Sequence, residues 1–342
     1  MSYSRYEENH MIRSQDATDR AIDTIDTKKS TVSIESGLSY IAEINKAFGN
    51  LKIYTSNLST MINTEVPKID FIQSGFKLGT IGFLNAPGAT GKSFFAIQTA
   101  MSLASCNRYK LINNLNYKSA KVAYISGEDD LDTINIRMRA ISKNFDEKTI
   151  KIISENLTVI DVIESGLKFL DFNSSNKIEK NTTSITILDT IAKHSDLIIL
   201  DTLSRFHLAS ENDNGEMSRL LNIFETIAKV NNCSILILHH NNKSSMNGKN
   251  DLEQNSARGA SSLISNSRYL ISLNKMSKED AKLYFGKEED PRRNYHIRCS
   301  FPKINYTAPI PDKWLKKGEG GTLSEVSLET FSASKRGTRY EH

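Results

Sequence analysis

The sequence predicts an α/β protein in which a mainly parallel, twisted sheet has helices on both faces. Strand-like and helix-like segments alternate along the chain from Gly79 onward, which is typical of βαβ units. Two continuous apolar runs, LIILD at 197–201 and CSILIL at 233–238, have the length and composition of strands buried on both faces. A glycine-rich loop at 85–93, NAPGATGKS, joins a predicted strand to a predicted helix. Together these features indicate parallel strands whose connections cross over through helices.

Each element is predicted from its local pattern in chain order. Strands are expected at 80–84, 121–126, 157–161, 197–201 and 233–238. Helices are expected at 92–105, 130–143, 185–194 and 216–231. Three more strand-like segments follow at 267–274, 295–301 and 321–328, and a turn-rich connection joins the last two. The sheet should therefore carry additional strands toward the carboxyl terminus.

The chain is expected to divide into an extension, one domain and a tail. Residues 1–36 are polar, mixed in charge and poor in large apolar residues, so we expect a poorly ordered extension with a short helix near 19–27. The predicted α/β domain spans 37–330 and begins with a helix, which the spacing of apolar residues over 37–63 suggests. The remaining residues, 331–342, form a basic tail.

Two polar segments interrupt this domain. Residues 172–184, FNSSNKIEKNTTS, are interpreted as a surface insertion. Residues 241–257 are rich in Asn, Ser and Gly, and they are interpreted as a mobile loop. Both interpretations follow from composition, because neither segment offers enough apolar surface to join the core.

Composition and cysteine usage limit the class of protein. A formal net charge of +4 over 342 residues is only mildly basic, so it does not by itself indicate a nucleic-acid-binding protein. Cys106, Cys233 and Cys299 are far apart and show no metal-ligand spacing, which favours reduced thiols in a cytoplasmic protein. The start of the chain has no apolar run, so no signal peptide is expected, and no membrane-spanning segment is expected elsewhere.

The loop at 85–93 is predicted to hold the phosphates of a nucleotide. Backbone N–H groups of a glycine-rich turn converge on an anion, and the following helix adds its positive end. Lys92 would supply charge to the β- and γ-phosphates, and the Ser93 hydroxyl would ligate Mg²⁺. The alternative is a tight turn with a surface lysine. The loop departs from the strict Walker A pattern at its first position, which is Ala rather than Gly. The predicted nucleotide-binding residues are Ala86, Pro87, Gly88, Ala89, Thr90, Gly91, Lys92, Ser93 and Asp201.

Polar residues at the ends of three predicted strands complete the candidate site. Asp201 ends LIILD, where an acid can hold Mg²⁺ through water; the alternative is a cap for the following turn. Glu128 follows KVAYIS and could polarise the attacking water, although it or Asp129 could instead start a helix. His239 and His240 end CSILIL, where a side chain could contact the γ-phosphate, and the alternative is a pair of ordinary polar residues. A zinc site is disfavoured because no third ligand lies at suitable spacing.

The motifs resemble those of a known family. GATGKS, YISGEDD, LIILDTLSRFH, ILILHH and ARGASSLISNSRY occur in the order and spacing of the plasmid RepA-type replicative helicases, which are hexameric RecA-like motors related to DnaB. The resemblance covers about 65–325 and leaves out roughly the first 40 residues and the segment 172–184. It implies a RecA-like P-loop core, ATP and Mg²⁺ bound between neighbouring subunits of a ring, and single-stranded DNA in the central hole.

The same resemblance assigns roles to residues of the candidate site. Lys92 and Ser93 would grip the phosphates and the metal, with Asp201 as the Walker B acid. Glu128 would be the catalytic base, and His240 would sense the γ-phosphate. These roles are expectations carried over motif by motif.

The resemblance also implies roles for arginines and for the DNA-facing loop. Arg137 would assist the site, and Arg268 would reach into the neighbouring subunit's site as an arginine finger, which neutralises charge in the phosphoryl-transfer transition state. Arg258 is the competing candidate for the finger, or else a loop residue that contacts phosphate. Lys243 and Lys249 would contact the DNA backbone without reading sequence.

Three functions are compatible with these features. The leading one is an ATP-dependent helicase of plasmid or mobile-element replication, with primase or initiator proteins as possible partners and no membrane association. The second is a RecA-like ATPase that regulates or remodels a DNA-bound complex without unwinding. The third is a small-molecule kinase, which fits the strand end at His239 and the polar loop after it poorly. Lys303, Lys316 and Lys317 are interpreted as solvated lysines, and the alternative is that they approach the neighbouring subunit or DNA.

Overall fold

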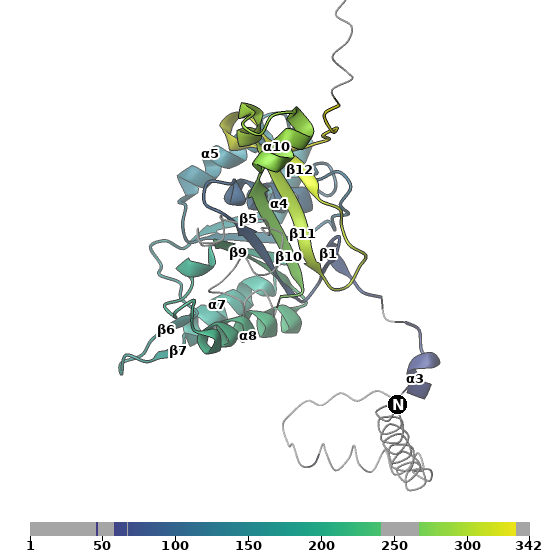
Figure 1. Ribbon diagram of the computed structural model, residues 1–342. Helices are drawn as coiled ribbons and strands as arrows, with labels where there is room; N and C mark the ends of the chain where they lie inside the picture. The colour runs from purple at the N-terminus through teal and green to yellow at the C-terminus, as the bar shows by residue number, and fades with distance from the viewer. Residues whose placement is uncertain (1–45, 47–57, 67, 241–266, 333–342) are drawn as a thin grey trace, which may run out of the picture. The chain divides into compact units, whose positions relative to one another are not determined.

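The computed structural model describes residue 46 and residues 58–66, 68–240 and 267–332 (Figure 1). The chain separates into two compact units, 1–68 and 69–342. In the first unit, the helix α3 (Leu58–Ile62) carries Leu58, Met61 and Ile62 with their side chains exposed. The predicted extension, most of the predicted first helix, the loop at 241–257 and most of the tail lie outside the described residues.

A nine-stranded sheet forms the centre of the second unit, with strand order β13-β12-β11-β10-β3-β9-β8-β4-β5. Six strands are mutually parallel: β3 (Ile81–Ala86), β4 (Val122–Ser126), β5 (Leu157–Asp161), β8 (Leu197–Asp201), β9 (Ser234–His240) and β10 (Tyr269–Lys275). Three antiparallel strands extend one side: β11 (His296–Ile304), β12 (Lys313–Lys317) and β13 (Leu323–Val326). The predicted class, a mainly parallel sheet with additional C-terminal strands, is confirmed.

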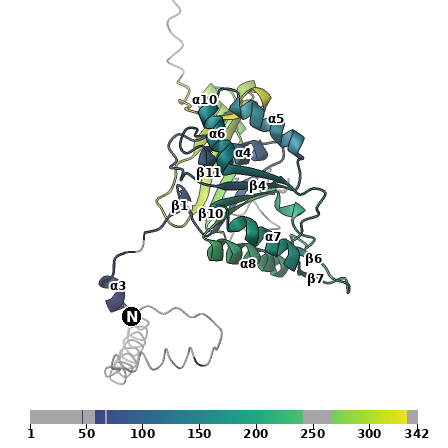
Figure 2. The same cartoon turned by 180° about the vertical axis from the view of Figure 1, so that it is seen from behind.

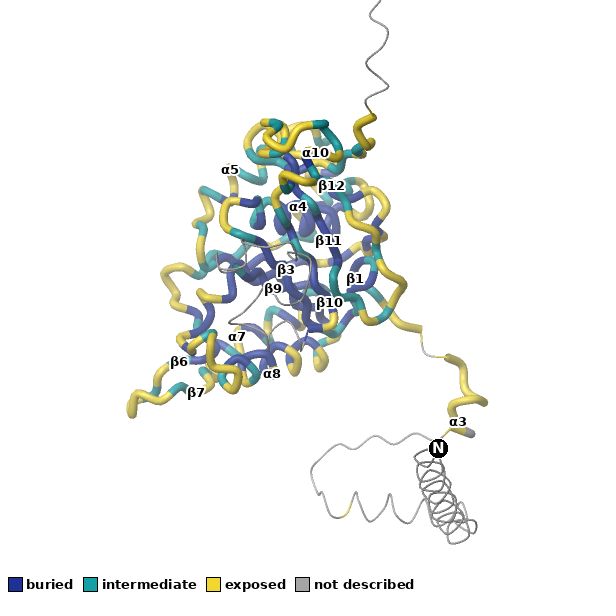
Figure 3. The backbone as a smooth tube through the Cα atoms, viewed as in Figure 1, coloured by how far each residue is buried: buried dark blue, intermediate teal, exposed yellow. Residues whose placement is uncertain are grey.

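The register brings the carboxyl ends of the parallel strands to one edge. Ser126 of β4 pairs with Asp201 of β8, and Ala86 of β3 pairs with His240 of β9. Every residue of β3, β4 and β8 is buried, in agreement with strands covered on both faces (Figure 3). Residues that are far apart in sequence therefore meet where these strands end.

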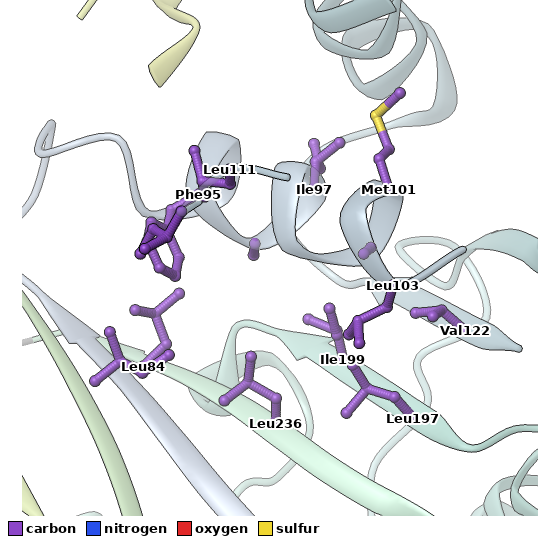
Figure 4. Packing of buried hydrophobic residues seen from close by; sticks show 14 of the residues in the cluster. Leu84, Phe95, Ile97, Met101, Leu103, Leu111, Val122, Leu197, Ile199 and Leu236 are labelled. Carbon is purple, nitrogen blue, oxygen red and sulfur yellow. The ribbon is translucent and has the colours of Figure 1, made fainter. Parts of the chain in front are cut away.

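Helices cover both faces of the sheet, as predicted (Figures 1 and 2). One face carries α4 (Lys92–Ala104), α5 (Leu131–Ser142) and α6 (Glu147–Asn156), and the other carries α7 (Thr182–Ala192) and α8 (Asn214–Asn231). Side chains of each strand alternate between the two cores: Leu84 of β3 packs with α4, whereas Phe83 packs with α8. Figure 4 shows Leu84 facing Phe95 of α4 in the first core.

Several elements were not predicted. The hairpin β1 (Phe71–Gln73) and β2 (Phe76–Lys77), the helix α10 (Lys278–Phe285), α6 and β12 fall in stretches to which the sequence analysis assigned no element. The strands among them have at most five residues, which is too short for a clear alternation of apolar and polar residues. Short 3-10 turns, η1 (Leu203–Arg205), η4 (Pro291–Tyr295) and η5 (Glu319–Gly321), connect the larger elements.

The polar segment at 172–184 contains a hairpin and a helix start. Strands β6 (Leu170–Phe172) and β7 (Ile178–Lys180) pair antiparallel. The Asn173 side chain accepts hydrogen bonds from the Ser175 and Lys177 N–H groups, which closes the turn. Helix α7 then begins three residues earlier than predicted, because the Asn181 side chain caps it by accepting from the Ser184 N–H.

No helix among the described residues is both long enough and apolar enough to cross a membrane.

Candidate nucleotide-binding site

The phosphate loop connects the buried strand β3 to helix α4. Gly91 ends the loop with φ 103°, a conformation that strongly favours glycine, and Ala89 also has a positive φ of 58°. No side chain caps the start of α4, so the first backbone N–H groups of this helix remain for an anion. The Thr90 hydroxyl is buried and has no hydrogen-bond partner among the described residues, as expected of a group that awaits a ligand.

Lys92 lies at the meeting point of three strand ends. Its Nζ donates to Thr202 Oγ1 at 3.1 Å and lies 2.9 Å from His240 Nε2. Thr202 in turn donates to the Leu238 carbonyl oxygen at 2.7 Å, which ties the residue after β8 to β9. Burial lowers the pKa of Lys92, against the opposing charge of nearby carboxylates led by Asp201. The ammonium group is therefore desolvated and held in place.

His240 lies within hydrogen-bond distance of Lys92, with 2.9 Å between Nε2 and Nζ. Burial and then the Lys92 charge lower the pKa of His240, against the raising effect of Glu128. In the neutral imidazole, Nε2 can accept a hydrogen bond from the Lys92 ammonium group. Its Nε2 also lies 3.6 Å from the Glu128 carboxylate, so one ring faces both the phosphate-loop lysine and the predicted base.

Asp201 presents a carboxylate oxygen to the site. Its Oδ2 accepts from the Tyr124 hydroxyl at 2.5 Å, whereas its buried Oδ1 has no hydrogen-bond partner in the described part of the chain. Burial raises the pKa of Asp201, opposed first by the Lys92 charge, then by the hydrogen bond from Tyr124 and by the nearby Ser93 hydroxyl. Magnesium prefers oxygen ligands of this kind, so the Asp201 Oδ1 and the Ser93 hydroxyl fit a bound Mg²⁺.

Three acidic residues, Glu128, Asp129 and Asp130, follow β4, and each makes different contacts. Asp130 caps α5 by accepting from the Thr133 N–H, so the helix-start role considered for Glu128 and Asp129 belongs to the next residue. Asp129 instead binds Arg137, whose Nη1 donates at 2.5 Å. Glu128 makes neither contact in the described structure, and its side chain is 40% exposed. This leaves the Glu128 carboxylate accessible beside His240.

Arg268 lies at the opposite edge of the sheet. Leu270 of β10 pairs with Phe83, so Arg268 is level with Ile81, five residues before the end of β3 and roughly 16 Å from it along the strand. It lines a cavity of about 520 Å³ with Glu225 and Lys229 of α8. Arg268 therefore cannot serve the phosphate loop of its own chain. Arg258, Lys243 and Lys249 lie outside the described residues.

Three residues near the site were missed by the sequence analysis or interpreted differently. Thr202 and Tyr124 contact Lys92 and Asp201, and their only sequence signals are a hydroxyl directly after the strand-ending acid and a hydroxyl within an apolar strand. Lys317, interpreted as a solvated lysine, instead donates to the Ala89 carbonyl oxygen at 2.9 Å, and burial lowers its pKa. Lys303, which was also interpreted as a solvated lysine, is partly buried. This burial lowers its pKa, and the Arg268 charge adds to the effect.

Comparison with known proteins identifies the family. Residues 59–246, more than half of the chain, match the family described as the AAA domain. The chain belongs to this AAA domain family. Family membership and the geometry of the phosphate loop make it a nucleotide-binding P-loop ATPase.

The fold of this AAA domain protein is RecA-like. It is similar to a DnaB-like replicative helicase described with its interactions with primase, with 14% identity, a TM-score of 0.52, and coverage of 96% of this chain and 80% of the other. It is also similar to a second solved structure, described as an ATPase domain, with 14% identity, a TM-score of 0.51, and coverage of 87% of this chain and 100% of the other. At this level of identity the similarity concerns the fold.

Proposed function

We propose that this protein is an ATP-driven helicase of plasmid or mobile-element replication that translocates on single-stranded DNA. ATP would be hydrolysed at the interfaces of a ring, most simply a hexamer, of identical chains. The observation that carries the proposal is the division of charged residues between the two edges of the sheet. Lys92, Glu128, Asp201 and His240 meet at one edge, whereas Arg268 lies at the other.

The residues of the first edge suit phosphoryl transfer to water. Lys92 and the free N–H groups at the start of α4 would bind the β- and γ-phosphates of ATP. Ser93 and Asp201 would hold Mg²⁺, which supplies positive charge to the phosphate oxygens when bound. Glu128, accessible and next to His240, would orient the attacking water and accept its proton.

His240 is placed to report the state of the nucleotide. Its ring contacts Lys92 and faces Glu128, and it is the last residue of β9, directly before the segment at 241–257. A γ-phosphate would compete for the Lys92 ammonium group and so change the His240 contact. We propose that this change moves the following loop, where Lys243, Lys249 and Arg258 would contact DNA phosphates.

The place of Arg268 supports the proposal of a ring of copies. A finger arginine stabilises negative charge on the transferred phosphoryl group and accelerates the reaction by ~10³–10⁵ in known cases. Because Arg268 cannot reach the loop of its own chain, it would serve the site of an adjacent copy. The DnaB-like helicase of similar fold interacts with primase, and we propose primase or initiator proteins as further partners of this chain.

The proposal is tested with Lys92→Ala and a matched Lys151→Ala control. Lys151 lies exposed on α6, so its removal should leave ATP hydrolysis unchanged. Lys92→Ala should lower kcat by at least ~10²-fold, as loss of one preorganised charged donor does, and should abolish displacement of a strand from forked DNA. Circular dichroism would establish that both variants are folded.

Two results would count against the proposal. Wild-type hydrolysis by Lys92→Ala would remove the site assignment. Hydrolysis by the wild-type protein that single-stranded DNA does not stimulate, with no strand displacement, would favour the regulating or remodelling ATPase instead.

A further inference from the structure

Glu211 joins the loop at 202–213 to the end of β9. This loop follows β8 and leads into α8, which Asp213 caps. Glu211 Oε2 lies 3.4 Å from His239 Nε2, and since a carboxylate only accepts hydrogen bonds, the His239 ring donates. The His239 side chain is 8% exposed and that of Glu211 is 35% exposed. The loop therefore contacts a buried ring of the strand.

The Glu211 carboxylate is charged at neutral pH. The hydrogen bond from His239 has the largest effect on the pKa of Glu211 and lowers it, while burial opposes this effect. Nearby His239, His207 and His240 lower the pKa of Glu211 further when they are charged. A charged acceptor forms a stronger hydrogen bond than a neutral one. The contact between Glu211 and His239 is thus suited to holding the two segments together.

His207 lies on the other side of Glu211 but does not donate to it. Its Nδ1 lies 3.1 Å from the Ala209 carbonyl oxygen, and because a carbonyl only accepts, Nδ1 carries the proton. Burial lowers the pKa of His207, so the ring is neutral and its Nε2 has a lone pair. This Nε2 lies 3.9 Å from Glu211 Oε1 and has no hydrogen-bond partner among the described residues. Of these two histidines, His239 is therefore the one that Glu211 binds.

His239 and His240 point to opposite faces of the sheet. Side chains alternate along a strand, and Ile237 belongs to the core with α8, whereas Leu238 belongs to the core with α4. His239 continues the first pattern and His240 the second, which agrees with the contact between His240 and Lys92 of α4. The two histidines share a planar peptide bond. Holding the His239 ring therefore restricts the backbone that carries His240.

The loop that carries Glu211 is anchored to other elements. The Ser210 N–H donates to Glu216 Oε2 of α8 at 3.0 Å. The Leu208 N–H donates to the Leu170 carbonyl oxygen of β6, also at 3.0 Å. Because these bonds hold the loop independently of β9, the Glu211 carboxylate provides a fixed support for the strand.

We propose that Glu211 is a positioning residue for ATP hydrolysis, which holds the His239 ring and thereby fixes the neighbouring His240 beside Lys92 and Glu128. The inference rests on the proposed role of His240 at the γ-phosphate, and it adds the residue that keeps His240 in place. Glu211 acts through His239 from the α8 side of the sheet.

The test measures ATP hydrolysis without DNA for Glu211→Ala, Glu211→Gln and a matched Glu155→Ala control, since Glu155 lies exposed on α6. Glu211→Ala should lower kcat about 10-fold and leave the KM for ATP nearly unchanged, because it misplaces a group that acts at the γ-phosphate and removes none that binds the nucleotide. Glu211→Gln keeps an oxygen that accepts from His239, so it should retain at least about half of the wild-type kcat. The control should match the wild type.

Histidine ring signals in nitrogen NMR spectra of the full chain give a readout that does not depend on hydrolysis. The His240 signals should shift in Glu211→Ala and stay near their wild-type positions in Glu211→Gln. Because glutamine carries no charge, this rescue separates the hydrogen bond to His239 from the electrostatic effect of the carboxylate.

A double variant tests whether Glu211 acts through His239. His239→Phe keeps a ring but removes the donor. Glu211→Ala combined with His239→Phe should have the kcat of the more impaired single variant, because each change removes the same contact. Losses that multiply in the double variant would overturn the inference.

Three further results would also overturn it. They are a wild-type kcat in Glu211→Ala, unchanged His240 signals in that variant, and equal impairment of Glu211→Ala and Glu211→Gln. If the wild-type protein neither responds to single-stranded DNA nor displaces a strand, the helicase proposal fails. The role of Glu211 is still decided in that case, because every measurement here is made without DNA.

Discussion

The ammonium group of Lys92 is buried and lies close to three carboxylates. Burial disfavours its charge, whereas Asp201, Glu128 and Asp129 favour it, and burial has the larger effect on the pKa of Lys92. A bound triphosphate would add negative charge and shift this balance toward the charged form. The site thus gains part of its electrostatic complementarity only when the nucleotide is present.

The close packing around Gly127 gives a prediction about stability. A Cβ at this position would lie 2.8 Å from Arg205 Cβ, and the Gly127 N–H donates to the Asp201 carbonyl oxygen at 2.7 Å. Gly127→Ala should therefore destabilise the protein by ~1–3 kcal/mol, the usual cost of overpacking. Gly88→Ala is the control, since nothing lies within 4 Å of a Cβ there. Similar urea midpoints for the two variants would contradict this explanation.

His207 predicts a pH dependence of stability. Burial lowers the pKa of His207, against the opposing charge of Glu211, so the unfolded chain binds the proton more readily than the folded one. Stability should therefore be lost as pH falls below ~6.5, the ordinary histidine pKa, toward the lowered folded value. His207→Gln should reduce this slope without removing it, because the pKa of His240 is lowered too. Unfolding free energies measured from pH 8 to 5 that fall equally in both proteins would refute the assignment.

At the scale of elements, α4 differs from four other helices in how its first turn is capped. Helices α5, α6, α7 and α8 are each preceded by a residue whose side chain accepts a hydrogen bond from a backbone N–H group of the first turn. These capping residues are Asp130, Asp146, Asn181 and Asp213. Helix α4 begins at Gly91 with no such cap. A capping side chain would occupy the N–H groups that the phosphates need, so its absence at α4 suits a phosphate site.

The cap of α8 gives a stability prediction. Asp213 Oδ1 accepts from the N–H groups of Gly215 and Glu216. Asp213→Ala should lower the free energy of unfolding by ~1 kcal/mol, and Asp213→Asn, which keeps an acceptor oxygen, by much less. Thermal melting of the three proteins measures the difference. An alanine variant that melts with the wild type would show that the cap contributes nothing.

At the scale of the whole molecule, the sheet separates the phosphate loop from Arg268. The phosphate loop follows the carboxyl end of β3, while Arg268 precedes β10 at the other edge. One chain therefore presents a nucleotide cradle on one edge and an arginine on the other. Identical copies that pair these edges around a closed ring would complete every site.

Mixed assemblies test this arrangement. Because each site would borrow an arginine from its neighbour, adding Arg268→Ala subunits to wild-type protein should depress ATPase activity more than dilution does. Arg108→Ala is the matched control, since Arg108 forms a surface pair with Asp146. Activity that falls in strict proportion to the Arg268→Ala fraction would argue against the finger role. A protein that remains a monomer in native mass measurements with ATP would do so as well.

The sequence by itself determined the class of fold and the local parts of the site. Local patterns can be recognised from the sequence alone. Here they are the strand and helix periodicity, the glycine-rich loop before Lys92 and the acid that ends LIILD. The polar ends of buried strands, Glu128 and His240 among them, were also predicted, because parallel strands end at one edge.

Only the tertiary structure decided which of these parts touch. Thr202 reaches Lys92 across 110 residues of sequence, and Lys317 reaches the Ala89 carbonyl across 228. Such contacts depend on strand order and register, which bring distant segments to one edge and are set by the packing of the whole sheet.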